Sequence, residues 1–181
     1  MLILKTVDKN RRAFGGFQWP ESGPVEAPDW NPLPVCGGGL HGLPWGEGDG
    51  ELLNWSTDSV WVVFDDEDSP VTVCFNGKCK TPRGVVVYCG DQRGATNYIR
   101  EHGGEYRAVV GARVEIGDRG RVVVGDMGVA FGGNGSVATA GYRGHASVGD
   151  DGYATAGRRG VASAGLRGEA TTLGLGTSTA G

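Results

Sequence analysis

Small apolar residues in the last third of the chain recur at a fixed spacing of eight. Residues 117–180 divide into eight octapeptides, and glycine occupies the first and the fourth position in seven of the eight. The sixth position is Val122 in the first octad and then almost always alanine. Agreement of this kind over many units indicates a repeat architecture in which each unit stacks on the next. The pattern predicts a narrow Gly/Ala-rich β-solenoid over residues 117–181.

Each octad contains a turn and a strand. The Gly-x-x-Gly segment predicts a tight turn, because glycine tolerates positive φ angles. The next four residues predict a short strand with alternating side chains, and we expect the uniform small residues at position 6 to face inward. Position 7 alternates between Thr and Ser from Thr139 to Thr171. This alternation predicts a 16-residue coil of two octads, and therefore about four coils.

The first part of the chain shows the shorter patterns of ordinary strands. We expect strands at Leu2 to Val7, Ser59 to Phe64, Gly84 to Cys89 and Tyr106 to Val110, because these runs are β-branched or aromatic. One helix is expected over residues 91–102, with Asp91 as its N-cap. The fold class is therefore mainly β: a small α+β domain over 1–110, a junction at 111–116, and the solenoid.

Asn76-Gly77 is a strong signal for a two-residue hairpin turn. Such a loop pairs Phe75 with Lys78 and then Cys74 with Cys79. We expect the two cysteines to face each other across the ladder, close enough to be oxidised.

Residues 14–50 are rich in Gly, Pro and Trp and show little periodicity. Four of the five tryptophans lie between residues 19 and 55, which favours a stretch ordered by aromatic packing. The candidate binding residues in this stretch are Trp19, Trp30, Cys36, His41 and Trp45.

Three interpretations of Cys36 and His41 remain open, and the structural one is favoured. In it, Cys36 is a small buried residue and His41 hydrogen-bonds a glycine-rich loop. As a nucleophile and base, the two side chains would have to be in hydrogen-bond contact. As zinc ligands, they would join Cys74 and Cys79, or Cys89, although the spacings are loose for a zinc site. No cofactor is expected, and zinc is the alternative.

Charge and hydropathy exclude several classes of partner. The net charge is −4, with −5 on residues 1–108 and +1 on the remainder, so nucleic-acid binding is not expected. No apolar run approaches the roughly 20 residues of a membrane helix. No apolar signal segment develops after Met1, so we expect a cytoplasmic protein, of a bacterial host, with reduced thiols.

Two resemblances accompany these patterns. The first part of the chain resembles a phage- and prophage-borne domain of unknown function. The resemblance is carried by Trp19-Pro20, Cys36-x-x-Gly39-Leu40-His41, Trp61 and the lysines Lys78 and Lys80. The octads, such as Ser136 to Gly141, resemble the β-roll heads of trimeric autotransporter adhesins and repeats of phage fibres. The second resemblance implies an oligomer-forming stalk or head.

Two known repeat functions are not expected. A calcium-binding roll needs Asp at a fixed position in unit after unit, whereas the eight octads contain only Asp118, Asp126, Asp150 and Asp151. An ice-binding surface needs ranks of Thr on one flat face, whereas position 5 begins with Arg121, Val129, Val137 and His145.

The sequence therefore favours a non-enzymatic, self-associating phage or prophage accessory protein that binds and blocks or sequesters a host protein. Burying an alanine methyl group stabilises the fold by only about 0.8 kcal/mol. Ordering the backbone of one residue costs about 1–2 kcal/mol in conformational entropy. We therefore expect association into a dimer or trimer, supported by the alanine column. A small enzyme centred on Cys36 and His41 is one alternative, and a virion or fibre component is another. The expected association residues are Ala138, Ala146, Ala154, Ala162 and Ala170.

Overall fold

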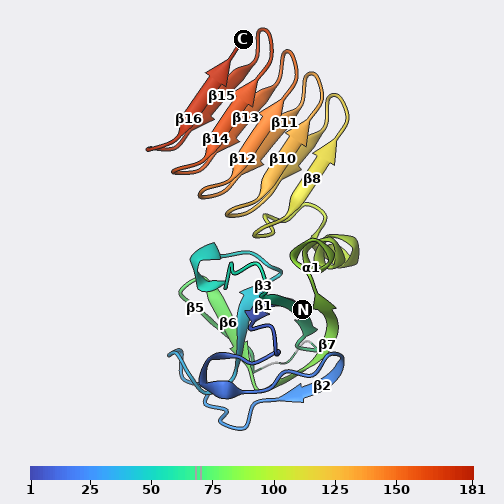
Figure 1. The fold of residues 1–181 in the computed structure, drawn as a ribbon, viewed down its shortest axis with the longest axis vertical. Helices are drawn as coiled ribbons and strands as arrows, with labels where there is room; N and C mark the ends of the chain where they lie inside the picture. Colours follow the sequence, from blue (N-terminus) through green and yellow to red (C-terminus); the bar gives the residue numbers. More distant parts are fainter. Residues whose placement is uncertain (68, 70) are drawn as a thin grey trace. The chain divides into compact units, whose positions relative to one another are not determined.

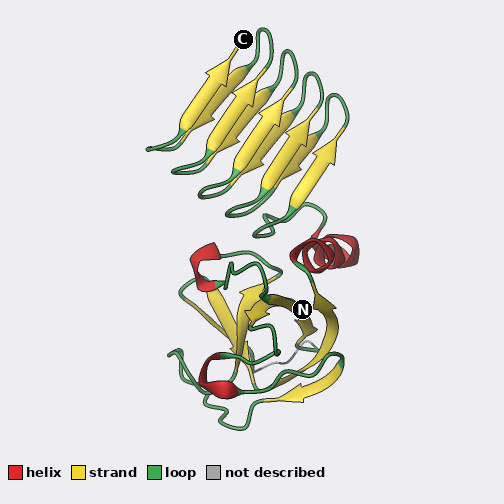
Figure 2. Ribbon diagram, in the orientation of Figure 1, coloured by secondary structure: helices red, strands yellow, loops and turns green. Residues whose placement is uncertain are grey.

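The chain forms two compact units, Met1–Gly103 and Gly104–Gly181, each built mainly from β-strands (Figures 1 and 2). The structure is a computed structural model that describes every residue except 68 and 70. No helix among the described residues is long and apolar enough to cross a membrane. The mainly β class with one α-helix and a C-terminal solenoid is confirmed.

The first unit contains an antiparallel sheet in the order β2-β7-β4-β1-β3-β6-β5. Strands β1 and β4 lie in its centre and pair from Leu2↔Asp65 to Val7↔Val60. Both are almost fully buried, so they are rich in Val, Ile and Leu. The strands are β1 (Leu2–Val7), β2 (Gly23–Glu26), β3 (Leu40–Pro44), β4 (Val60–Asp65), β5 (Val73–Phe75), β6 (Lys78–Thr81) and β7 (Arg83–Gly90).

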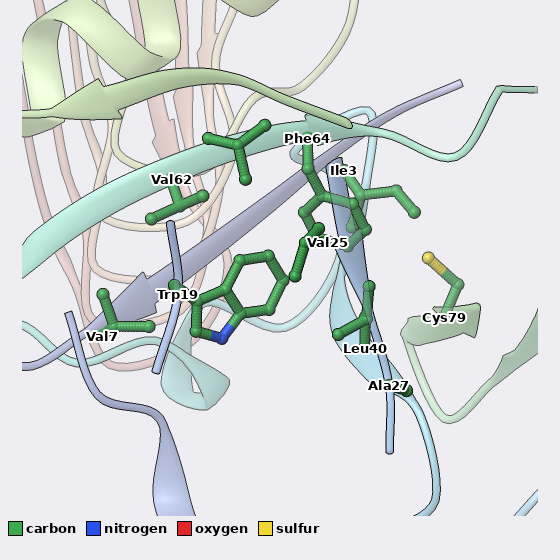
Figure 3. Packing of buried hydrophobic residues seen from close by; sticks show 10 residues of the cluster. Ile3, Val7, Trp19, Val25, Ala27, Leu40, Val62, Phe64 and Cys79 are labelled. Atoms are coloured by element: carbon green, nitrogen blue, oxygen red, sulfur yellow. The ribbon is translucent and has the colours of Figure 1, made fainter. Parts of the chain in front are cut away.

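The core of this unit is organised around Trp19 (Figure 3). The Trp19 ring is 1 % exposed and lies 5.1 Å from the ring of Phe64 on β4, centroid to centroid. Ile3, Val62 and Leu40 belong to the same cluster. The stretch 14–50 is thus ordered by aromatic packing, as expected, and it also supplies β2 and β3, which the sequence did not predict.

The helical segment departs from its predicted end. Helix α1 (Gln92–Ile99) begins after Asp91, whose carboxylate accepts a hydrogen bond of 2.7 Å from the Gly94 amide, as predicted for an N-cap. The α-helix ends at Ile99 and continues as a π-helical turn, η3 (Arg100–Gly104), with Gly103 at φ +107°. The strand predicted at Tyr106 to Val110 is wrong, because that segment is irregular. Two short 3-10 turns are η1 (Phe14–Gly16) and η2 (Gly50–Leu52).

The predicted hairpin is confirmed. Strands β5 and β6 pair Phe75 with Lys78 and Cys74 with Cys79. Asn76 and Gly77 both have positive φ, at 47° and 73°, as a two-residue hairpin turn requires. Cys79 is buried, whereas Cys74 on the opposite strand is exposed.

The second unit is a solenoid of two parallel sheets (Figure 1). Successive strands of one sheet are sixteen residues apart, for example Ala138↔Ala154, so the predicted coil of two octads is confirmed. The first strand, β8, lies in the segment expected to be a junction, since it pairs with β10. One sheet holds β8 (Arg113–Ile116), β10 (Val129–Gly132), β12 (His145–Val148), β14 (Val161–Ala164) and β16 (Thr177–Ala180); the other holds β9 (Arg121–Val123), β11 (Val137–Ala140), β13 (Tyr153–Ala156) and β15 (Glu169–Thr172).

The solenoid interior consists of small side chains at positions 6 and 8 of the octads. Ala138, Ala146, Ala154 and Ala162 are each at most 2 % exposed. The predicted inward direction of this column is therefore confirmed.

The glycines at the first position of the octads allow the backbones of stacked turns to approach closely. The expectation that they are needed for positive φ angles is therefore wrong. The positive φ falls on the third residue of each turn, for example Arg119, Arg143 and Asp151 at 53° to 58°. A Cβ on Gly141 would lie 2.5 Å from Asp126 Oδ1 and 2.6 Å from Asp126 N on the coil below. Glycine is needed there because the backbones of stacked turns leave no room for a side chain.

Side-chain ladders link the turns of successive coils. Asp118 Oδ1 accepts from the Asn134 amide at 2.7 Å, and Asn134 Oδ1 accepts from the Asp150 amide at 2.9 Å. Asp150 Oδ1 then accepts from the Leu166 amide at 2.8 Å. The division into octapeptides did not predict this ladder, because its members are sixteen residues apart.

Candidate functional site

The first unit contains an open pocket of about 660 Å³. Its walls are the segments 13–17, 27–29 and 36–41, together with Lys5, Trp19 and Lys78. This volume lies in the range of small-molecule sites. The pocket is therefore the candidate binding site of this unit.

A buried lysine holds the glycine-rich wall of the pocket. Lys80 on β6 has no exposed surface, and its Nζ donates to the carbonyl oxygens of Val35 at 3.0 Å and Gly37 at 2.9 Å. Gly37, Gly38 and Gly39 have φ of +87°, +63° and +141°, which larger residues adopt only with strain. The loop is thus fixed by hydrogen bonds to an ammonium group, a role that the sequence did not reveal for Lys80.

Cys36 is exposed, so the prediction that it is a buried residue is wrong. Its Sγ lies 3.1 Å from the Nζ of Lys78, which donates to it. The glycines that follow carry no side chains that could cover the thiol. Cys36 is therefore a polar feature of the pocket wall.

His41 behaves as the structural interpretation predicted. Its Nδ1 lies 3.0 Å from the carbonyl oxygen of Gly39 in the glycine-rich loop. Its Nε2 is buried and has no hydrogen-bond partner among the described residues. Burial lowers the pKa of His41, and Lys5, Lys78 and Lys80 lower it further, outweighing the Gly39 bond. The imidazole is therefore neutral at pH 7.

Lys5 brings a second cation to the pocket. Burial, and then the charge of Lys78, lower its pKa from 10.5 to about 8. Its Nζ lies 5.7 Å from the centroid of the Trp19 ring. Across residues 1–67, 69 and 71–181, no carboxylate forms an ion pair with Lys5 or Lys78. Within the described residues, the two ammonium groups are therefore not neutralised by a carboxylate.

The pocket unites three of the five candidate binding residues. Trp19, Cys36 and His41 line it. Trp30 lies behind the loop, with its ring 5.8 Å from Lys80 Nζ. Trp45 is outside the pocket and close to Gly103, where an added Cβ would meet its ring at 3.3 Å. Lys5 and Lys78 complete the site. Lys78 belonged to the sequence resemblance, but no sequence pattern placed either lysine beside Cys36 and His41.

The catalytic and zinc alternatives find no matching geometry. The Cys36 thiol contacts Lys78, and neither nitrogen of His41 contacts the thiol, so no nucleophile–base pair is formed. Apart from residues 68 and 70, no three His, Cys, Asp or Glu side chains gather closely enough to hold a metal ion, which leaves the set Cys36, His41, Cys74 and Cys79 dispersed.

In the second unit, the outer faces of the solenoid carry aligned columns of side chains. On the four-stranded sheet, Thr139, Thr155 and Thr171 occupy equivalent positions on neighbouring strands. On the five-stranded sheet, Ser147 and Ser163 do the same, and Ser163 Oγ donates to Ser147 Oγ at 2.9 Å. The argument against an ice-binding surface considered position 5 alone, whereas position 7 does form ranks of hydroxyl groups.

The outer face of the five-stranded sheet is also hollowed into a shallow groove of about 400 Å³. Val129, Phe131 and Val161 supply apolar side chains to this groove, and His145 lies between the two valines in the ladder. The guanidinium of Arg113 packs over the Phe131 ring at 4.8 Å. We call this surface the groove face.

The alanines expected to support association lie inside the solenoid. Ala138, Ala146, Ala154 and Ala162 are buried between the two sheets of one chain, and Ala170 is partly buried. The four buried alanines therefore have almost no side-chain surface through which to contact a second chain, and any contribution of theirs to association is indirect.

The chain is similar to two ice nucleation proteins. It is 36% identical over 109 residues to the ice nucleation protein InaA of Pantoea ananas, covering 60% of this chain and 8% of that protein. It is 36% identical over 100 residues to an ice nucleation protein of Xanthomonas campestris pv. translucens, covering 55% of this chain and 6% of the relative. The chain thus spans less than a tenth of each relative. No family model and no solved structure matches the chain.

Proposed function

We propose that the chain is a non-enzymatic binding protein whose solenoid associates with a second copy and whose first unit recognises a target. The observation that carries the association is the groove face, where Val129, Phe131 and Val161 line one hollow on the outer face of the five-stranded sheet. Val161 is 37 % exposed although it is apolar. Packing two such faces together removes the apolar side chains of both from water, which stabilises the pair. The alanine interior of one solenoid buries little apolar surface by comparison.

Light scattering on the full chain tests the association. The molar mass of the wild type is expected to be two or three times the 18.8 kDa of one chain. Val161→Glu places a charge in the groove face and is expected to give monomers, because an unpaired charge is costly to bury. Tyr153→Glu is the matched control, because Tyr153 is 53 % exposed on the opposite sheet. Monomeric wild type, or equal effects of both variants, contradicts the association.

The recognition half of the proposal concerns a host protein as the target of a phage or prophage accessory protein. Its support is the resemblance carried by Cys36-x-x-Gly39-Leu40-His41, which lies in the pocket wall. Affinity capture from a bacterial host lysate with the wild type and with Phe14→Ala, which alters a fully exposed aromatic at the pocket rim, tests it. A protein retained by the wild type and lost with the variant supports this half; no specific capture contradicts it.

Ice nucleation is a second candidate, favoured by the column of Thr139, Thr155 and Thr171 and by the similarity to ice nucleation proteins. Droplets containing the protein would then freeze at a higher temperature than droplets of buffer. Thr155→Lys would interrupt the column and lower that freezing temperature, with Arg159→Lys as a turn control. Freezing of wild-type droplets at the temperature of buffer removes this candidate.

A further inference from the structure

We propose that the pocket of the first unit binds a small anionic ligand that carries a flat apolar ring. The proposal concerns a different unit from the groove face, so it stands or falls independently of the association. It rests on the charges, the aromatic rim and the glycine-rich wall of the pocket.

The charges come first. Lys5 and Lys78 both line the pocket, and within the described part of the chain neither forms an ion pair with a carboxylate. Asp29 also lines the pocket, and its Oδ1 accepts a hydrogen bond from the Gly39 amide at 3.2 Å. His41 stays neutral, so the pocket has a net positive charge. Two cations held close together in a partly dehydrated site favour an anion over a neutral ligand.

The cost of holding these cations supports the same conclusion. Lys5 is partly buried beside Lys78, and this burial and the neighbouring charge lower the pKa of its ammonium group. Among the described residues, the face of the Trp19 ring lies 5.7 Å from this ammonium group and offsets part of that cost. A bound carboxylate or phosphate group supplies the missing counter-charge.

The aromatic rim selects the rest of the ligand. Phe14 lines the pocket while being fully exposed, and it is followed by Gly15 and Gly16 at φ +81° and +83°. An added Cβ on either glycine would contact nothing within 4 Å, so space surrounds the segment. Phe17 lies deeper in the pocket, edge-on to Trp19 at 5.9 Å between ring centroids. A planar ring that stacks on Phe14 would remove its apolar surface from water.

The glycine-rich wall completes the site. Lys80 fixes the carbonyl groups of Val35 and Gly37, so the loop is held in place before a ligand arrives. The amides of Gly37 and Gly38 have no hydrogen-bond partner among the described residues. Such amides, together with the ammonium groups, provide donors for an anionic group.

The shared chemistry is an anion joined to a ring, and two classes of molecule provide it: aromatic carboxylates and nucleotides. Isothermal titration of the full chain with indole-3-acetate and with AMP distinguishes them, with inorganic phosphate as the probe for the charge alone. Saturable binding of either ring-bearing anion supports the proposal and identifies the class. Absence of saturable binding for both up to about 10 mM overturns it.

Variants test the assigned roles. Lys78→Gln is expected to weaken binding of the ring-bearing anion at least about tenfold, because it removes one cation from the site. Lys9→Gln is the matched control, because Lys9 is exposed in a turn and does not line the pocket. Phe14→Ala is expected to weaken binding of the ring-bearing anion and to leave the affinity for inorganic phosphate unchanged. Equal losses in Lys78→Gln and Lys9→Gln, or no loss in Lys78→Gln with its circular dichroism unchanged, overturn the proposal.

Discussion

Ala138 and Ala154 lie directly opposite each other on adjacent parallel strands, sixteen residues apart, and both are buried between the two sheets of the solenoid. The space between the sheets is filled by methyl groups, so it cannot accept a larger or charged side chain without displacement of a strand.

Ala154→Asp is therefore expected to destabilise the solenoid by more than about 3 kcal/mol, since a buried carboxylate finds no partner there. Thermal unfolding followed by circular dichroism measures the effect. Tyr153→Asp changes the neighbouring, outward-facing residue and is expected to alter stability by less than about 1 kcal/mol. Similar losses in the two variants would show that the assigned inward and outward directions are wrong.

The glycines of the turns are expected to differ in their tolerance of substitution. Gly141→Ala brings a Cβ within 2.5 Å of Asp126 Oδ1 and is expected to cost about 1–3 kcal/mol. Gly135→Asn is expected to change stability by about 0.5 kcal/mol or less, because asparagine tolerates the φ of +65° and the nearest atom is 3.4 Å from the new Cβ. Urea unfolding compares the two. A larger loss for Gly135→Asn would indicate that positive φ, rather than close approach, selects these glycines.

The buried charge of Lys5 gives a pH-dependent prediction. Below about pH 8, Lys5 is charged in both the folded and the unfolded chain, and the folded chain carries the full cost of burial. Between about pH 8 and 10.5 the folded chain has released the proton and the unfolded chain still holds it, so wild-type stability gains from this group as pH rises.

Lys5→Met is accordingly expected to be more stable than the wild type at pH 7, with a difference that shrinks as pH rises through that window. Urea unfolding at about pH 7 and about pH 10 measures the difference, with Lys9→Met as the exposed control. A stability difference that stays constant with pH, or a destabilised Lys5→Met at pH 7, contradicts the assigned cost of burial.

Three of the four thiols should react at very different rates. Cys36 and Cys74 are exposed and are expected to be alkylated by iodoacetamide in the native state. Cys79 is expected to be protected until the chain unfolds, because burial, and then the neighbouring Cys74, raise the pKa of its thiol. Peptide mass spectrometry at successive times measures the extent of alkylation at each cysteine. Early labelling of Cys79 would contradict the packing of β6 against the core.

The solenoid could be predicted from sequence because each structural feature recurs. The inward alanines and the 16-residue coil follow from spacing alone, and the separate hairpin of the first unit follows from the residue types at Asn76-Gly77. The wrong explanation of the glycines arose from a property that spacing does not contain: the distance between stacked turns. The Asp118–Asn134–Asp150 ladder was missed because a ladder between coils has twice the period of the octads.

The pocket was harder to predict because it is assembled from segments far apart in the chain. Cys36 and His41 were chosen as an isolated motif, but the cations that define their surroundings come from β1 and β6. Lysine side chains are usually exposed, and only the tertiary fold shows that Lys80 is fully buried and that Lys5 is partly buried in the pocket wall. Sequence patterns carry no information on such long-range contacts.

Photo-crosslinking from the groove face tests association through that face most directly. With the photoreactive amino acid p-benzoylphenylalanine in place of Val161, irradiation of the full chain is expected to give a covalent dimer. Mass spectrometry is expected to find the attachment on residues 129–163 of the second copy. The same group in place of Tyr153 is expected to give little dimer. Crosslinking from position 153 but not from position 161, or from neither, would contradict association through the groove face.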